Sequence, residues 1–345
     1  MRAWCAVVLA ILSSLAVGQN AAISPPAPAV TQPSLAAARK ALQSGHADEA
    51  IAMLRQLATA TPPEAGVARE LGLAYYRTGK LVPAEQAFAQ AMQQDPQDIE
   101  STQLRGLTLY RLGRPAAAIP YLEKVRQWLP NANADANYVL GLCYLNSQRY
   151  DDARHSFAAQ YGVPPDSGPA YLLFGNMLMH SHLPEMAAEA AAKALALTPD
   201  LPLAHLMLGE VALFKSDPQR ALDEFTRERQ INPDNPAVYD RLGDAFIRLG
   251  DYPHAQEALT KAISLDTSST GPFILMGKVL LHKEDPQTAA MYLQHAVKMD
   301  PGNYMTHTLL AQAYRALGRE AEAKEEIGQA SRIHADNQLT LQPVE

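Results

Sequence analysis

The chain has 345 residues, of which 48% are hydrophobic and 19% are charged, and its formal net charge is −7 at pH 7. A mildly acidic balance without blocks of like charge disfavours a nucleic-acid groove, which needs clustered Lys and Arg to displace counterions. Length alone suggests about two domains, but a repeat that spans the sequence indicates one continuous array instead.

The first 18 residues have the pattern of a signal peptide. Arg2 supplies the positive charge, residues 4–17 form the apolar stretch, and the small residues Ala16 and Gly18 suit cleavage near Gln19. We therefore expect export, to the periplasm or as a secreted protein. The alternative is a membrane anchor formed by an uncleaved N-terminal segment.

Beyond the signal the chain is expected to divide into three parts. Residues 19–30 are rich in Pro and Ala and predict an extended linker. Residues 31–337 carry one repeated pattern, and residues 338–345 are expected to form a flexible tail. Alanine recurs at one register, with seven spacings of 34 residues and one of 35, at Ala50, Ala84, Ala118, Ala153, Ala187, Ala221, Ala255, Ala289 and Ala323.

Each unit is predicted to contain two helices joined by a short turn. In the second unit Leu71, Gly72, Tyr75 and Tyr76 lie on one side of a helix of period 3.6, and Gly79 ends that helix. A second helix follows and ends at an Asp-Pro pair. In the third unit Pro115 opens the second helix and Pro120 falls inside it, so we expect a kink there.

Glycine occupies one interior position of the first helix in seven units. Glycine inside a helix costs about 1 kcal/mol relative to alanine. We therefore expect the two helices of a unit to approach too closely for a larger side chain at this register. The positions are Gly72, Gly106, Gly141, Gly175, Gly209, Gly243 and Gly277.

This unit, Leu-Gly-x-x-Tyr followed by Ala, Phe, Ala and Pro, resembles the tetratricopeptide repeat. The segments LGLAYYRTG at 71–79, LGLCYLNSQ at 140–148 and LGDAFIRLG at 242–250 carry the resemblance, which covers nine units over residues 31–337. It implies an all-α, right-handed α-solenoid of about nine helix–turn–helix repeats, whose first helices line a concave groove.

Three residues depart from the family pattern. Thr267 replaces the closing proline of the seventh unit, and Gln160 and Glu228 stand where the pattern has a small residue. We expect local loosening of the array at these positions.

Signatures of catalysis are absent: the sequence contains no HExxH, GxSxG or GxGxxG motif. The histidines His180 and His182 lie near Met177, Met179 and Met186, a set that suits copper. The alternative for these residues is a polar turn followed by methionines that fill gaps in the core. We therefore expect no enzyme activity, no cofactor and no metal site.

The concave face is the expected binding site, because the first helices present apolar side chains one turn apart. Exposed, these would mark a partner site, but they can equally pack against neighbouring first helices. The positions are Leu107, Leu142, Leu145, Leu172, Met179, Leu206, Leu213, Ile274 and Leu281.

Polar residues flank this strip and complete the predicted groove. Tyrosine and arginine are favoured at interface hot spots, and solvated rim residues are the alternative. Some family members grip a peptide C-terminal carboxylate with Lys and Asn on successive first helices, but here the corresponding polar residues are isolated. The flanking set is Tyr76, Arg77, Tyr110, Arg111, Asn176, Asp244, Arg248 and Lys278.

Taken together, these features predict a non-catalytic scaffold that binds a protein or peptide in an apolar concave groove. By analogy with exported members of the family, a role in secretion or envelope assembly is expected. No nucleic-acid partner and no membrane span after signal cleavage are expected. The alternatives are an accessory or metal-carrying subunit of an exported enzyme complex and, less favoured, a helical repeat that binds nucleic acid.

Overall fold

The computed structural model describes residues 33–60, 62, 64–129 and 134–340. The predicted signal peptide and the linker over 19–30 lie outside the described residues. Every regular element in the described part is an α-helix. The predicted all-α repeat solenoid is therefore confirmed.

The helices form nine consecutive hairpins. The first helices of the hairpins are α1 (Leu35–Gln43), α3 (Val67–Arg77), α5 (Ile99–Arg111), α7 (Ala134–Asn146), α9 (Gly168–His180), α11 (Ala204–Phe214), α13 (Pro236–Leu249), α15 (Thr270–His282) and α17 (Tyr304–Ala316). The second helices are α2 (Ala47–Leu57), α4 (Leu81–Gln94), α6 (Pro115–Trp128), α8 (Tyr150–Gln160), α10 (Pro184–Leu197), α12 (Pro218–Ile231), α14 (Tyr252–Leu265), α16 (Pro286–Met299) and α18 (Glu320–Thr340).

Two helices bear on predictions made from the sequence, one for a proline inside a helix and one for the end of the last repeat. Helix α6 runs continuously from Pro115 to Trp128 with Pro120 inside it; the kink expected at Pro120 stays a prediction. Helix α18 continues to Thr340, three residues past the expected end of the last unit at 337. Residues 341–345 lie outside the described part.

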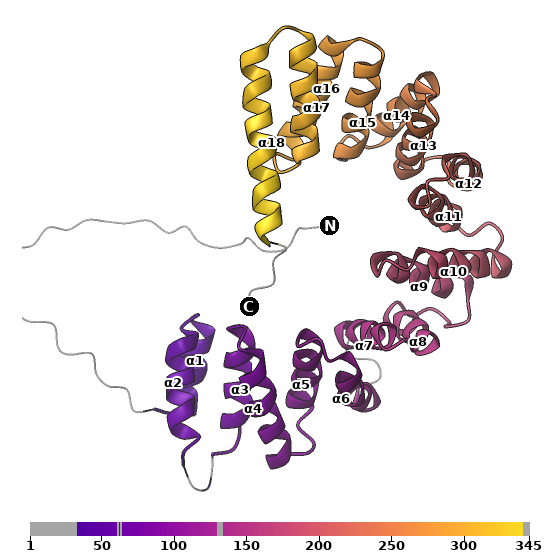
Figure 1. Cartoon of the computed structure of the whole chain (residues 1–345). Helices are drawn as coiled ribbons and strands as arrows, with labels where there is room; N and C mark the ends of the chain where they lie inside the picture. Colours follow the sequence, from indigo (N-terminus) through magenta and orange to yellow (C-terminus); the bar gives the residue numbers. More distant parts are fainter. Residues whose placement is uncertain (1–32, 61, 63, 130–133, 341–345) are drawn as a thin grey trace, which may run out of the picture.

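The hairpins stack into a curved array. Each helix packs on the next one along the chain. Successive first helices in the described part also contact each other, except α7 and α9, whereas the described second helices make no such contacts with one another. First helices therefore lie on the inside of the curve, as Figure 1 shows for α9 and α11 relative to α10 and α12. The predicted concave face is lined by the first helices.

In six hairpins a glycine of the first helix lies against a bulky side chain of the second helix, whereas Gly175 lies against Met207 of the next first helix, α11. A methyl group at Gly72 would lie 2.6 Å from Cδ1 of Phe88, and one at Gly243 would lie 2.6 Å from Cδ2 of Leu259. Both partners are fully buried. The close approach of helices that the glycine register predicted is present.

Glu228, at a small-residue position of the pattern, does not loosen the array. Its side chain is fully buried. Its Oε1 accepts a hydrogen bond of 2.7 Å from the N–H of Leu203, and its Oε2 accepts one of 3.3 Å from the N–H of Leu206. These donors lie at the start of α11, where a negative charge is favoured by the helix dipole. The loosening predicted at Glu228 is therefore wrong.

The turn at Thr267 is likewise ordered by a side chain. The carboxylate of Asp266 accepts hydrogen bonds of 2.8 Å from the N–H and 2.6 Å from the hydroxyl of Ser268. The same turn forms at Asp95 and Asp300, in units that have the closing proline, so it does not depend on a proline. The loosening predicted at Thr267 is wrong for this reason.

The joint after Gln160 is a different case. Helix α8 has 11 residues where α10 has 14, and α7 and α9 are successive first helices without contact in the described part. The joint is held by the buried Arg154, whose guanidinium bonds the carbonyl of Pro165, pairs with Asp166 at 2.8 Å and lies 4.5 Å over the ring of Tyr171. At this position the array is indeed looser.

Gly243→Leu is expected to lower the free energy of unfolding by about 3 kcal/mol, because a larger side chain overpacks the contact with Leu259. Gly328→Leu is the matched control, since nothing lies within 4 Å of a Cβ at Gly328 in α18. Urea denaturation followed by circular dichroism measures both. Equal midpoints for the two variants would contradict the close-packing argument.

Glu228→Ala restores the small residue of the pattern, yet we expect it to lower the free energy of unfolding by about 1–3 kcal/mol, because two N–H groups at the start of α11 lose their acceptor. Glu228→Gln keeps one carbonyl oxygen and should lose less. The same denaturation assay ranks the three proteins. A Glu228→Ala variant as stable as the parent would rule out the capping role.

Candidate functional site

One position of the first helix is exposed in seven successive units. It lies five residues after the glycine of the close contact, in the last turn of the first helix. A side chain at this position lies outside the core of its own hairpin. We call this set the end row: Arg77, Arg111, Asn146, His180, Phe214, Arg248 and His282. Because the first helices line the inside of the curve, the end row follows the concave face.

The predicted apolar strip is not an exposed surface. Leu145, Leu172 and Leu213 are buried, and the other six apolar members are half-buried. Several of them pack with the core clusters, as Leu107, Leu142 and Met179 do in the largest cluster. Most of the surface of these apolar side chains is therefore covered by packing between units. This is the alternative to an exposed binding strip that the sequence left open.

The polar members of the predicted set are the more accessible ones. Tyr76, Tyr110 and Asp244 are half-buried. The exposed members are Arg77, Arg111, Asn176, Arg248 and Lys278. Asn176 and Lys278 lie on α9 and α15, with α11 and α13 between them, so the structure does not bring these two together.

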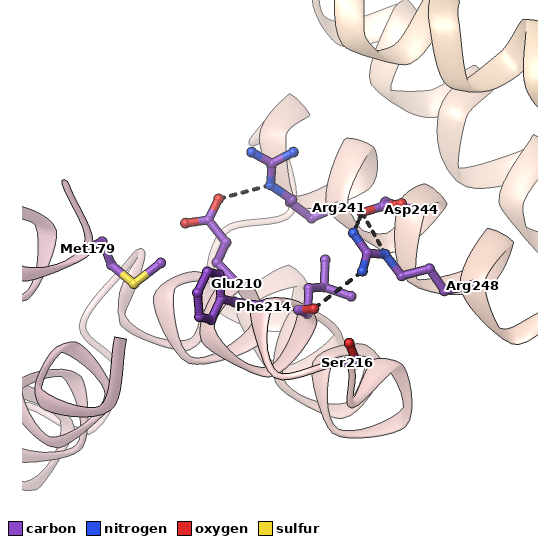
Figure 2. Close-up of a pocket in the computed structure, with 8 residues that line it drawn as sticks. Met179, Glu210, Phe214, Ser216, Arg241, Asp244 and Arg248 are labelled. Carbon is purple, nitrogen blue, oxygen red and sulfur yellow. Dashed lines mark hydrogen bonds and ion pairs between the residues drawn. The ribbon is translucent and has the colours of Figure 1, made fainter. Parts of the chain in front are cut away.

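A hollow of about 510 Å³ spans α9, α11 and α13. We call it the Phe214 hollow. It is lined by Met179 from α9, Glu210 and Phe214 from α11, and Arg241 and Arg248 from α13. The Phe214 residue is 64% exposed, although it is a large aromatic. Figure 2 shows Phe214 and Glu210 between Met179 on one side and the arginines on the other.

The charges around the Phe214 hollow are matched within it. Arg241 Nε lies 2.9 Å from Glu210 Oε1, and its Nη1 lies 3.2 Å from Asp240 Oδ2. Arg248 Nη2 lies 3.0 Å from Asp244 Oδ2, and its Nη1 donates to the carbonyl of Leu213 at 3.3 Å. The arginines are therefore held in place by carboxylates, and the hollow has no excess of positive charge.

Asp240 is a carboxylate of this group with a perturbed proton affinity. Burial raises the pKa of Asp240, the neighbouring Arg241 opposes the rise, and Asp244 and Glu210 add to it. Its Oδ1 is buried without a hydrogen-bond partner. The carboxylate is therefore held in place mainly through its other oxygen, which faces Arg241.

A second hollow of about 500 Å³ lies between the ends of α5 and α7. We call it the Arg111 hollow, and it is lined by Tyr110, Arg111, Gly113, Pro115 and Asn146. Burial is the main factor that raises the pKa of Tyr110, so its phenol stays protonated and able to donate at neutral pH.

Two contacts position the side chains around the Arg111 hollow. The guanidinium of Arg111 lies 4.7 Å over the ring of Tyr76, in the preceding unit. The amide of Asn146 is anchored by a hydrogen bond of 2.9 Å from its Nδ2 to the carbonyl of Leu142. Predicted groove residues of the second and third units therefore meet at this place with Asn146 of the fourth.

Sequence reasoning missed Asn146, Glu210, Phe214 and Arg241 as groove residues. A signal for Phe214 was available, because Phe214 follows Gly209 by the same five residues that separate Arg77 from Gly72. Counting along this register finds every member of the end row. A search for apolar residues instead selects positions such as Leu213, one residue before the end row, which are packed against neighbouring helices.

The histidines of the copper hypothesis are exposed, and His182 lies in a turn with φ of 58°. Among the described residues no group of three or more His, Cys, Asp or Glu is placed to hold a metal ion. None of the helices in the described part of the chain is both long and apolar enough to cross a bilayer.

Cys143 is expected to be unreactive in the folded protein. Burial raises the pKa of its thiol to about 12, so the thiol stays protonated at pH 8, and thiolate is the reactive form. The sequence has a second cysteine, Cys5, so the test uses a Cys5→Ser variant, whose labelling with Ellman's reagent at pH 8 should be negligible in native protein and complete in denaturant. Rapid labelling without denaturant would contradict the burial of this side chain.

Comparison with known families identifies the repeat. Tetratricopeptide repeat models match residues 41–107, 109–173 and 175–236. The middle TPR-like domain of cilia and flagella-associated protein 70 matches residues 215–334. The chain belongs to the tetratricopeptide repeat family. This fold is generally a non-catalytic scaffold, and protein or peptide binding is typical of it.

Several solved structures resemble parts of this chain at low sequence identity. The chain is 19% identical to Pseudomonas aeruginosa pilF, over 59% of this chain and 92% of that chain, with a TM-score of 0.49. It is 18% identical to MamA from Desulfovibrio magneticus RS-1, over 50% and 97% of the two chains, with a TM-score of 0.45.

A tetratricopeptide repeat protein from Parabacteroides merdae is 16% identical, over 71% of this chain and 97% of that chain, with a TM-score of 0.43. The comparison with curated proteins gave no match. These similarities concern the fold alone. The function must therefore be argued from this chain's own surface.

Proposed function

We propose that this chain is an exported, non-catalytic scaffold that binds a peptide or an extended segment of a protein along its concave face. One observation carries the proposal: Phe214 is 64% exposed inside a hollow that three first helices share. An exposed aromatic in a concave site gains free energy when a partner covers it, and such residues dominate binding at interfaces.

The surroundings of Phe214 support a macromolecular partner. The hollow is open, and the end row continues it through neighbouring units, so a ligand that uses this face is expected to be extended. Ion pairs of Arg241 and Arg248 with Glu210 and Asp244 form a polar rim beside the aromatic. An apolar anchor within a polar rim is the usual anatomy of a protein interface.

The proposal includes export of the protein out of the cytoplasm. The signal pattern over residues 1–18 supports export to the periplasm or secretion. A scaffold exported in this way would serve in secretion or envelope assembly, by bringing partners together rather than by chemistry. The net charge of −7 supports a protein partner over a nucleic acid.

Phe214→Ala should weaken peptide binding about 30-fold, the equivalent of about 2 kcal/mol at a hot spot. The probes are peptides selected from a random dodecapeptide library on the unmodified protein, with affinities measured by fluorescence anisotropy. Phe214 is a better test than Leu213, because Leu213 is buried and its substitution would disturb packing.

Met291→Ala is the matched control, because Met291 is 62% exposed on the second helix α16. It should leave the affinities within about twofold, as expected for a surface substitution outside the binding face. Selected peptides that bind Phe214→Ala as tightly as the parent would overturn the proposed use of this hollow.

A further inference from the structure

We propose that the second to fourth repeats bind an acidic stretch of the partner through its side-chain carboxylates. The proposed receptor is the cationic corner formed by Arg77, Arg111 and Arg114 with Tyr76 and Tyr110 around the Arg111 hollow. This inference rests on the proposed binding function of the concave face. It specifies the chemistry of one part of the bound segment.

Several other arginines of the first helices have carboxylate partners. Arg241 and Arg248 pair with carboxylates, and so does Arg69, with Asp98 and Glu100. Within the described residues none of the three arginines of the corner forms an ion pair with a carboxylate. Their positive charge is therefore available to a ligand.

The geometry of the corner suits a carboxylate. The guanidinium of Arg111 lies 4.7 Å over the ring of Tyr76, so the ring covers one face of the group and the N–H donors at its edge stay accessible. Arg77 makes a single long hydrogen bond of 3.5 Å to the carbonyl of Leu42. Such guanidinium edges bind carboxylates in a bidentate manner. The protonated phenol of Tyr110 adds a donor beside them.

Helix-dipole compensation does not account for this corner. A cation in the last turn of a helix is favourable, which fits Arg77 and Arg111. The same register carries Phe214 in α11, however, so the fold does not require a cation there. Arg114 is the N-cap residue of α6, where a positive charge is unfavourable. Other units also carry a cation at this register, but there Lys80, Arg149 and Arg319 pair with carboxylates. A ligand explains all three charges together.

An acidic peptide fits better than a nucleic acid. The corner offers three cations, whereas nucleic-acid sites commonly neutralise about 6–10 phosphates. Farther along the same face the carboxylates of Glu210, Asp240 and Asp244 offset Arg241 and Arg248, so that region offers no net positive charge to a long polyanion. A segment with a few acidic side chains at one end and apolar side chains at the other meets both the corner and the Phe214 hollow.

The test uses a fluorescein-labelled peptide of six Glu-Ala units with an amidated C-terminus, so that side chains carry all its carboxylates. Controls are the Gln-Ala peptide and labelled dT12. The full-length protein should bind the Glu-Ala peptide and not the Gln-Ala peptide, as measured by anisotropy. The double variant R77E/R111E should lose at least about 30-fold in affinity, since each reversed charge removes a charge-assisted pair.

The matched control is R220E/R229E, which makes the same change of charge on exposed positions of the second helix α12. It should bind the Glu-Ala peptide within about threefold of the parent, because distant surface charges are screened by salt. Circular dichroism should show the same helicity for both double variants. An equal loss in both variants, no binding by the parent, or tighter binding of dT12 would overturn the inference.

The outcome is separable from that of the proposed function. If the library peptides depend on Phe214 but the Glu-Ala peptide does not depend on the two arginines, only the acidic corner is wrong. If the Glu-Ala peptide depends on Arg77 and Arg111 while library peptides ignore Phe214, the corner stands and the Phe214 hollow is not the general binding site.

Discussion

The close contact between a glycine of the first helix and a bulky side chain of the second is the constraint on which the other features depend. At Gly72 and Gly243 no room exists for a methyl group beside Phe88 and Leu259. The contact fixes the two helices of a hairpin against each other. Because the same contact recurs along the chain, identical hairpins stack, and the first helices meet on the inside of the curve.

Curvature has a direct consequence for binding. It gathers the last turns of the first helices along one concave face, and the end row there is free of the packing that restricts the rest of each hairpin. Its residues can therefore differ from unit to unit without cost to the fold. In this chain they change from Arg77 and Arg111, through Phe214, to Arg248 beside Asp244, so cationic, apolar and charge-matched regions follow one another along the face.

Where the pattern of small residues is interrupted, polar side chains form the contacts between helices. Glu228 occupies the place of a small residue and bonds the first N–H groups of α11. Arg154 holds the loop after the short helix α8 and reaches Tyr171 of α9. Each buried charge has partners with good geometry, as buried charges require. An interruption of the pattern therefore marks a change in the kind of contact rather than a gap in the array.

The sequence by itself determined the helical hairpins, their nine-fold repetition and the glycine contact, because these depend on residues close together along the chain with a constant spacing. It did not determine which side chains of the first helices stay exposed. Leu213 and Phe214 are adjacent and both apolar, yet one is buried and the other is 64% exposed. Only the tertiary structure decided between them, because exposure depends on where the neighbouring unit places its first helix.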